Sequence, residues 1–309
     1  MKSMFMNYFK DGKLYQWDVS RETYLISDTN INGEFCLNQT NMNTLLMFEN
    51  PTLALKDGLL KIQSGKIKAN LKLSDEKLVI PNLEFEETLK LNVDKIKIAS
   101  KFVDKNISKF ILSGVHIGKD GIYATNNYSG YRYVCENNCS LILSNSFVKM
   151  LMNLSGELEF KFNKNIIACE YQNELYVGRL IEGAYPNVKE MYSISKYPKE
   201  VVINKQELKD FLAYENNKNS FVILDNNKIT INEIATNNNY TFESEFELPI
   251  DEKICLSYEK LINVINSIED EEIRIKYSEG KKPLLFNNEF ILLPCVIADD
   301  EKTEEEEEE

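Results

Sequence analysis

The chain has 309 residues, of which 43% are hydrophobic and 28% charged, as in soluble globular proteins of two or three domains. Neither a long apolar run nor a signal-peptide design occurs, which argues against a membrane-spanning or secreted protein, so we expect it in the cytoplasm. The net charge of −13 argues against a uniformly basic nucleic-acid-binding protein, although much of the negative charge lies in residues 299–309.

The residue types also limit the chemistry. His116 is the single histidine, which excludes Ser-His-Asp triads, Cys-His dyads and multi-histidine metal sites, and it lies in an apolar segment where we expect a half-buried structural residue. No glycine-rich phosphate loop occurs. Six sparse cysteines predict reduced thiols, and the Cys135–Cys139 pair lacks the partners of a zinc site. We therefore expect no metal, no cofactor and no enzymatic activity.

Three segments share one order: an apolar strand, a polar residue that caps a helix, an amphipathic helix, and then strands with alternating apolar residues. Their strands begin at residues 35, 141 and 254, and their predicted caps are Asn38, Ser144 and Ser257. The apolar helix positions are, in chain order, Met42, Leu45 and Leu46; Phe147, Met150, Leu151 and Leu154; and Leu261, Val264, Ile265 and Ile268. The strands that follow include residues 52–55 and 67–73 with a turn at Asp57-Gly58, residues 158–162, and residues 273–277.

A further helix precedes two of these segments. Asn92 is predicted to cap a helix at residues 93–103, and Asn204 a helix at residues 205–214 with Glu207 at the capping-box position. No counterpart precedes Asn38, so we expect the first repeat to lack its opening strand and helix.

The spacing of the repeat predicts the domain organisation. Leu37, Leu143 and Leu256 occupy equivalent positions and are separated by 106 and 113 residues. This regularity predicts three tandem α+β domains, each with its helices on one face of antiparallel sheets. We expect a truncated domain at residues 1–86, complete domains at 87–197 and 198–298, and an acidic disordered tail at 299–309.

Three stretches resemble the bacterial DNA polymerase III beta subunit, the DNA sliding clamp. Residues 179–186 read RLIEGAYP, similar to the family's R-L-I-[ED]-G-x-[YF]-P. Residues 112–115 (LSGV) and 123–126 (YATN) resemble its L-x-G-[VI] … A-T-D, and residues 290–296 (FILLPCV) resemble its terminal Y-L-[IV]-[ML]-P-[VM]-R. The resemblance implies crescent-shaped protomers of tandem clamp domains, which close head to tail, most simply as a homodimer, into a ring around duplex DNA.

The resemblance also implies a function and its partners. A ring of this kind is a processivity factor that tethers the replicative DNA polymerase, is placed on DNA by a clamp loader, and performs no chemistry. The lysine row in and after the helix at 93–103 fits phosphate contacts without base readout. The predicted DNA-facing residues are Lys97, Lys101, Lys105, Asn106, Lys109, Phe110, Lys205, Lys209 and Lys260.

A peptide-binding pocket between the second and third domains is implied in the same way. In the family it accepts a short, apolar-tipped peptide from partner proteins. The matching residues are Leu112, Thr125, Tyr128, Pro186, Met191, Ile291, Leu293, Pro294 and Cys295, although Leu112 and Ile291 equally fit a core role.

The chain departs from the family pattern around this pocket. The family's His-Arg reads Tyr128-Ser129, its terminal arginine reads Val296, and the Asp of A-T-D is Asn126, which predicts a dedicated set of partners. The composition rich in Asn and Lys indicates a phage or mobile-element clamp. Two alternatives remain open, namely a clamp-like decoy or regulator that binds replication proteins without encircling DNA, and a carboxylate-based hydrolase.

Overall fold

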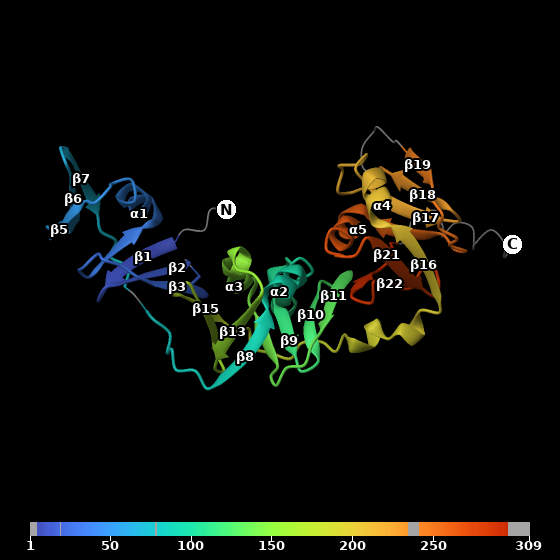
Figure 1. Cartoon of the computed structure of the whole chain (residues 1–309), viewed down its shortest axis with the longest axis horizontal. Helices are drawn as coiled ribbons and strands as arrows, with labels where there is room; N and C mark the ends of the chain where they lie inside the picture. The colour runs from blue at the N-terminus through green and yellow to red at the C-terminus, as the bar shows by residue number, and fades with distance from the viewer. Residues whose placement is uncertain (1–4, 19, 78, 234–240, 296–309) are drawn as a thin grey trace. The chain divides into compact units, whose positions relative to one another are not determined.

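A computed structural model of the chain describes residues 5–18, 20–77, 79–233 and 241–295. Within these ranges the chain forms four antiparallel sheets and five α-helices, together with short 3-10 helices (Figure 1). It divides into two compact units, residues 1–97 with 137–183 and residues 98–136 with 184–309. None of the helices in the described ranges combines the length and the apolar character that a membrane crossing requires.

The elements follow one another in three repeats. The first comprises β1 (Phe5–Lys10), β2 (Lys13–Asp18), β3 (Thr23–Asp28), β4 (Phe35–Asn38), α1 (Gln39–Leu45), β5 (Thr52–Lys56), β6 (Leu59–Ser64) and β7 (Ile67–Lys72). The second comprises β8 (Glu87–Asn92), α2 (Val93–Ser100), η1 (Ile107–Ser113), β9 (Val115–Gly118), β10 (Gly121–Thr125), β11 (Ser129–Val134), β12 (Leu141–Leu143), α3 (Asn145–Met150), η2 (Leu151–Asn153), β13 (Glu157–Phe162), β14 (Ile166–Tyr171) and β15 (Glu174–Arg179).

The third repeat follows two short 3-10 helices, η3 (Lys189–Tyr192) and η4 (Ile194–Lys196). It comprises β16 (Lys199–Asn204), α4 (Lys205–Leu212), β17 (Phe221–Asp225), β18 (Lys228–Asn232), β19 (Thr241–Glu245), β20 (Ile254–Ser257), α5 (Tyr258–Ile265), β21 (Glu272–Tyr277), β22 (Leu284–Phe286) and β23 (Phe290–Leu292).

The sheets show how the repeat is built. Two eight-stranded sheets run β4-β1-β2-β3-β15-β14-β13-β8 and β12-β9-β10-β11-β23-β22-β21-β16, and two smaller sheets run β19-β18-β17-β20 and β5-β6-β7. Each eight-stranded sheet therefore joins two four-stranded halves along a seam, β3 with β15 in one and β11 with β23 in the other. The sheet β5-β6-β7 corresponds to one such half without, in the described residues, a counterpart of β8 or β16.

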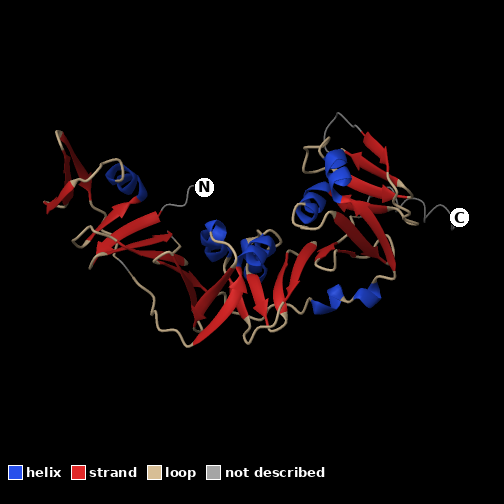
Figure 2. Ribbon diagram, in the orientation of Figure 1, coloured by secondary structure: helices blue, strands red, loops and turns tan. Residues whose placement is uncertain are grey.

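The helices of the first unit cover its sheet on one face. Figure 2 shows α1 and α3 on the same side of the eight-stranded sheet, where α1 packs on β1 and β4 and α3 on β3 and β15. Phe147 of α3 lies so close to β15 that a Cβ on Gly178 would stand 2.3 Å from its ring, so this contact requires glycine. A second cluster joins β1 and α1 to the sheet β5-β6-β7 through Phe9, Met42 and Leu60, and burying each such side chain stabilises the fold by roughly 1.5–3 kcal/mol.

The second unit packs its helices against both of its sheets. Helix α4 lies on β16, α5 contacts β20 and β23, and the two helices touch each other. The alternation predicted at residues 273–277 is confirmed, because Ile273, Ile275 and Tyr277 of β21 are all buried. Most predicted helix caps are confirmed as well, since Asn38, Ser144 and Asn204 each accept a hydrogen bond from a backbone N–H of the first helical turn.

Several local predictions were wrong. Helix α2 ends at Ser100 instead of residue 103, because Lys101 and Phe102 turn the chain with backbone hydrogen bonds to residues three positions earlier. Helix α4 ends at Leu212 instead of residue 214. Leu46, assigned to the apolar stripe of α1, is 69% exposed, and Ser257 precedes α5 without a capping bond from its side chain.

Candidate functional site

An apolar cluster lies at the seam between β11 and β23 in the second unit, where Gly130 pairs with Ile291. We call it the seam cluster. Its buried members are Tyr123, Val188, Tyr192, Tyr197, Leu285 and Ile291, and its partly buried edge consists of Tyr185, Met191 and Leu293.

The irregular segment 184–197 supplies much of this cluster and is held by its own hydrogen bonds. The Tyr197 hydroxyl donates to the carbonyl of Met191 at 2.6 Å, and the N–H of Met191 donates to the carbonyl of Val188 at 3.1 Å. Tyr192 enters the cluster so deeply that a Cβ on Gly130 would come within 2.9 Å of its hydroxyl. A larger residue at this position of β11 would therefore require the Tyr192 side chain to shift.

A tight turn at residues 125–129 borders the cluster. The Asn126 Oδ1 accepts hydrogen bonds from the N–H of Tyr128 at 3.1 Å, the N–H of Ser129 at 2.9 Å and the Ser129 hydroxyl at 3.2 Å. Asn127 adopts a left-handed φ of 70°. The turn is tied to the cluster because the Tyr185 hydroxyl accepts a hydrogen bond from the N–H of Thr125 at 3.0 Å.

The same turn presents an exposed aromatic ring beside a lysine. Tyr128 is 57% exposed, and its carbonyl accepts a hydrogen bond from the N–H of Leu293 at 2.9 Å. The ammonium nitrogen of Lys260, on α5, lies 3.8 Å from the centre of the Tyr128 ring, well within the range of a cation–π interaction. Lys260 was predicted to face DNA, but the structure brings it to a residue of the predicted peptide pocket.

The structure brings most of the nine predicted pocket residues to this region. Met191, Ile291 and Leu293 belong to the seam cluster, while Thr125 and Tyr128 are hydrogen-bonded to it. Ile291 is only 1% exposed, so it is a core residue. The other four are less directly connected: Pro186 is exposed, Pro294 is half-buried, the Leu112 carbonyl accepts from the N–H of Asp104, and the Cys295 N–H donates to the carbonyl of Cys255.

The predicted lysine row does not form a helical stripe. Lys97 is only 18% exposed, and its ammonium forms an ion pair with Asp94 at 3.1 Å and donates to the carbonyl of Leu154. Lys205 is bound in a similar way, because its ammonium donates to the carbonyl of Ile268 beyond the end of α5. Both cations are thus engaged inside the chain, where they interact favourably with the carbonyls near a helix terminus.

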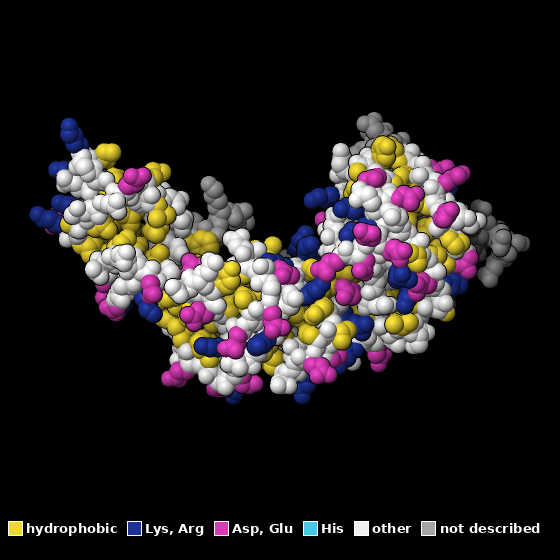
Figure 3. All heavy atoms as spheres, in the orientation of Figure 1, with side chains coloured by type: hydrophobic (Ala, Val, Ile, Leu, Met, Phe, Trp, Pro, Cys, Tyr) yellow, Lys and Arg dark blue, Asp and Glu magenta, His cyan; other side chains and the backbone are white. Residues whose placement is uncertain are grey.

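The remaining predicted DNA-facing residues are more accessible. Lys101 and Lys105 are exposed and follow the end of α2, with the Lys101 ammonium 3.4 Å from the Ser267 hydroxyl. Asn106 is exposed, Phe110 is 53% exposed, and Lys209 of α4 is half-buried, whereas the side chain of Lys109 lies outside what the structure describes. On the face of the second unit visible in Figure 3, Lys and Arg side chains are interspersed with Asp and Glu.

His116 has the structural role predicted for it. Its ring is half-buried and stacks on Tyr185, with ring centres 4.8 Å apart and planes 14° apart. Burial lowers the pKa of His116, so its ring is neutral at pH 7. The six cysteines are all free thiols. Within the described ranges, no group of three or more His, Cys, Asp and Glu residues is arranged to hold a metal ion.

Three residues of the stretch with the strongest family resemblance, Arg179, Leu180 and Glu182, also line a cavity of the first unit. Arg179 and Glu182 contribute to its wall, together with Glu86 and Asn163, and its volume is about 450 Å³. The lining contains two acidic residues, Glu86 and Glu182, and two basic ones, Lys164 and Arg179, so its net charge favours no particular ligand.

Sequence reasoning missed several residues of the seam cluster. Tyr123, Val188, Tyr192, Tyr197 and Leu285 were not predicted to belong to the site. A usable signal was the density of aromatic residues after residue 184, which is high for a connection between domains. The contact between Lys260 and Tyr128 joins residues 132 positions apart and leaves no pattern in the sequence.

Comparison with known proteins identifies the fold. No protein-family model and no curated protein matches the chain. Among solved structures, the DNA polymerase III beta subunit of Thermotoga maritima matches with a TM-score of 0.76 and 18% identity, over 96% of this chain and 92% of that one. A proposed beta subunit from Eubacterium rectale matches with a TM-score of 0.80 and 16% identity, over 96% of this chain and 92% of that one. The Helicobacter pylori beta clamp bound to a DNA ligase peptide matches with a TM-score of 0.76 and 16% identity, over 95% of this chain and 92% of that one. The chain therefore has the fold of the bacterial DNA polymerase III beta clamps.

Proposed function

We propose that the chain is a DNA sliding clamp, a processivity factor that encircles duplex DNA in the cytoplasm and tethers a replicative DNA polymerase. The observation that carries this proposal is the beta-clamp fold, matched over 96% of the chain and built from the repeat that the sequence itself contains. A tether of this kind acts by raising the effective concentration of the polymerase at the primer end, so it requires binding surfaces and no catalytic group.

The carboxylates of the chain support a binding role over a hydrolytic one. A catalytic acid typically has a raised pKa, whereas the resolved shifts of described Asp and Glu residues are all downward. A hydrogen bond from the Tyr8 hydroxyl lowers the pKa of Glu34, and a hydrogen bond from the N–H of Gly156 lowers that of Asp94. These groups are partners of structural contacts. The buried Glu215 and Glu233 also accept hydrogen bonds within the fold, Glu215 from the Ser220 hydroxyl at 2.8 Å and Glu233 from the Asn217 side-chain amide at 2.8 Å, so a carboxylate-based hydrolase is the weaker hypothesis.

The seam cluster is the proposed docking site for partner peptides. Met191 and Leu293 form a partly exposed apolar edge next to the rigid turn that carries Tyr128. The Helicobacter pylori clamp, which has the same fold, was solved with a DNA ligase peptide bound. By analogy, the polymerase and the clamp loader would each present a short apolar segment to this edge.

DNA would be held by sparse phosphate contacts. Lys101 and Lys105 are exposed cations that follow the end of α2, and the half-buried Lys209 on α4 offers a third cation. Asn106 lies between α2 and η1, and Phe110 lies in η1. Such contacts carry no sequence preference and weaken steeply with salt, which suits a ring that slides along the duplex.

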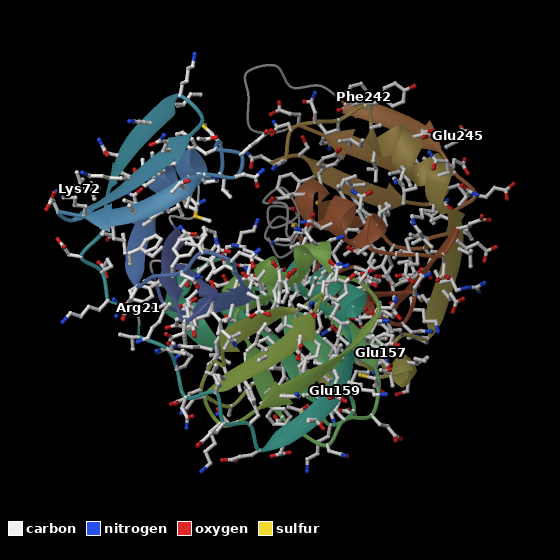
Figure 4. The ribbon with its side chains drawn as sticks, turned by 60° about the vertical axis from the view of Figure 1, so that its left-hand side comes forward. Arg21, Lys72, Glu157, Glu159, Phe242 and Glu245 are labelled. Carbon is white, nitrogen blue, oxygen red and sulfur yellow. The ribbon has the colours of Figure 1, made fainter. Side chains whose placement is uncertain are left out.

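Closing a ring would require a second copy of the chain, and two edge strands are suited to meet. Strand β19 ends its sheet with Glu243 and Glu245 exposed, and β7 ends another with Lys68 and Lys72 exposed (Figure 4). Unpaired edge strands readily pair with another chain. Glu243 already forms an ion pair with Lys228 at 2.5 Å, but Glu245 and the two lysines of β7 have opposite charges that favour β19 with β7 of a second copy. Each of these regions also has an exposed apolar side chain. Met47, which follows α1, is 79% exposed. Tyr214, which follows α4, is 70% exposed, and its ring lies 6.0 Å from that of Phe242 in β19.

Charge exchange tests this assembly. The double variant Lys68→Glu/Lys72→Glu should shift the chain toward monomer in mass photometry, and so should Glu243→Lys/Glu245→Lys. An equimolar mixture of the two should recover dimers, because each repelled edge then meets an attractive one. An unaltered dimer in both single populations would place the interface elsewhere, and a wild-type monomer at high micromolar concentration would refute the closed ring.

Primer extension on circular DNA tests the function itself. With its matched loader and polymerase, a sliding clamp should lengthen the products of a single binding event, and linearising the template should abolish the gain because the ring slides off the ends. A decoy or regulator that binds replication proteins without encircling DNA would shorten the products or leave them unchanged. That result would refute the proposed function while leaving the fold intact.

A further inference from the structure

Lys260 places a positive charge at the edge of the seam cluster. Its ammonium lies over the Tyr128 ring at 3.8 Å, and no carboxylate in the described ranges forms an ion pair with it. Other lysines of this region are already neutralised, Lys189 by Asp120 at 2.7 Å and Lys196 by Glu190 at 3.7 Å. Arg132 also lies against the seam cluster, 4.8 Å from the centre of the Tyr192 ring, but its guanidinium donates to the carbonyl of Asn288. At the Tyr128 edge of the cluster, the half-buried Lys260 is a cation that remains open to a negatively charged ligand.

The backbone that carries the ring beneath this cation is held in place. The backbone of Tyr128 is hydrogen-bonded on both sides, its N–H to the Asn126 side chain and its carbonyl to the N–H of Leu293. Because Leu293 also belongs to the partly buried edge of the seam cluster, the ring and the apolar edge are connected through a single backbone hydrogen bond. The Lys260 charge thus lies close to the place where an apolar side chain would dock.

We propose that Lys260 is a carboxylate receptor that makes this site select apolar peptides carrying an acidic side chain next to their apolar anchor. The apolar anchor would pack on Met191 and Leu293, and the neighbouring Asp or Glu would accept hydrogen bonds from the Lys260 ammonium. This inference rests on the proposed docking of partner peptides and adds the chemistry that selects among them. A charge-assisted contact beside apolar surface is stronger than the same contact in water, because fewer water molecules compete for the charges.

Phosphate contact with DNA is the competing role for Lys260. The observations favour the peptide, because the ammonium is held over a ring joined to the seam cluster, whereas a cation that tracks a sliding duplex gains from being mobile and exposed. Removing the Lys260 charge would change the preference among peptides in one role and the retention on DNA in the other, so one set of variants distinguishes the two roles.

The experiment measures two labelled nonapeptides by fluorescence polarisation against the full chain. Both contain two adjacent leucines, preceded in one by aspartate and in its twin by asparagine. The wild-type chain should bind the aspartate peptide about fivefold more tightly, the upper end for a solvent-accessible ion pair, and the difference should shrink as salt is raised. Lys260→Met, which keeps the apolar stem and removes the charge, should bind both peptides equally.

Three further variants identify the cause. Lys281→Met removes a charge from an exposed loop of the same unit and should preserve the fivefold preference. Tyr128→Leu should reduce the preference, because the ammonium loses the ring that positions it. Leu293→Asp should abolish binding of both peptides, because it puts a charge into the apolar edge.

Each outcome has one meaning. If the wild type and Lys260→Met bind both peptides equally, the carboxylate receptor is refuted while the docking site stands. If neither peptide binds the wild type, or if folded Leu293→Asp binds both unchanged, the docking site itself is refuted. If Lys260→Met alters retention on circular DNA without altering the peptide preference, Lys260 is a DNA contact instead.

Discussion

The turn at residues 125–129 allows a sharp test of how the proposed docking site is held. Asn126 accepts three hydrogen bonds through one oxygen atom, from the Tyr128 N–H, the Ser129 N–H and the Ser129 hydroxyl. Asn126→Ala removes the acceptor, so that these three donors are either bound by water or left without a hydrogen-bond partner. Asn126→Asp keeps an oxygen acceptor in the same position and is the matched control.

The expected size of the effect follows from the burial of the turn. Each bond contributes about 0.5–1.5 kcal/mol to stability, but Asn126 is half-buried and water can replace part of what is lost, so we expect a total of about 1–2 kcal/mol. In a unit of this size that corresponds to a fall in Tm of about 2–8 °C, at about 2–4 °C per kcal/mol. Because Tyr128 also loses its anchor, the affinity for an apolar peptide should fall in Asn126→Ala and stay near the wild-type value in Asn126→Asp.

Hydrogen exchange locates the change. The amides of Tyr128 and Ser129 should exchange faster in Asn126→Ala, while those of β21, at the far side of the same sheet, should keep their protection. Equal Tm, equal exchange and equal peptide affinity in the alanine and aspartate variants would refute the reasoning, because the acceptor would then contribute nothing to the turn.

Two further predictions concern DNA and pH. Lys101→Glu/Lys105→Glu should shorten the lifetime of the chain on circular DNA and flatten its salt dependence without lowering Tm, and an unchanged lifetime would make these lysines ordinary surface residues. Burial lowers the pKa of His116 below its value of about 6.5 in the unfolded chain, so the unfolded chain binds more protons at this residue as the pH falls. The contribution of the neutral His116 ring to the stability of the fold is therefore complete above about pH 6.5 and is lost at lower pH. Between about pH 7.5 and about pH 5.5, wild-type Tm should therefore fall further than that of His116→Phe, which keeps a ring against Tyr185; parallel curves would contradict this.

The sequence predicted the repeated elements well because their signals are local. A capping side chain lies two or three positions from the N–H that it accepts from, and the alternation in β21 repeats every second residue. The end of α2 was less predictable, because Phe102 and Val103 remain buried after the helix has ended at Ser100. Apolar spacing reports burial, and burial continues through a turn as readily as through a helix.

The lysines were predicted less well because their partners are distant in sequence. Lys97 bonds to the carbonyl of Leu154, and Lys205 to that of Ile268, separations of 57 and 63 residues. In both cases the lysine lies in the first helix of a repeat and the carbonyl follows the second helix. The folding of the repeat therefore places the lysine next to its carbonyl partner. A spacing of four residues between lysines is compatible with a phosphate-binding stripe and with such internal bonds alike, and only the fold distinguishes them.

The departures from the family pattern are better understood together than singly. The resemblance implies arginines beside the peptide pocket, and this chain has Ser129 and Val296 at those positions. Position by position, these changes predict a site without positive charge. The structure nevertheless places the Lys260 ammonium against Tyr128, the residue that stands in the His position of the same motif. A cation from α5 can thus replace one lost from the turn after β10, because what an acidic peptide senses is the position of the charge and not the element that supplies it.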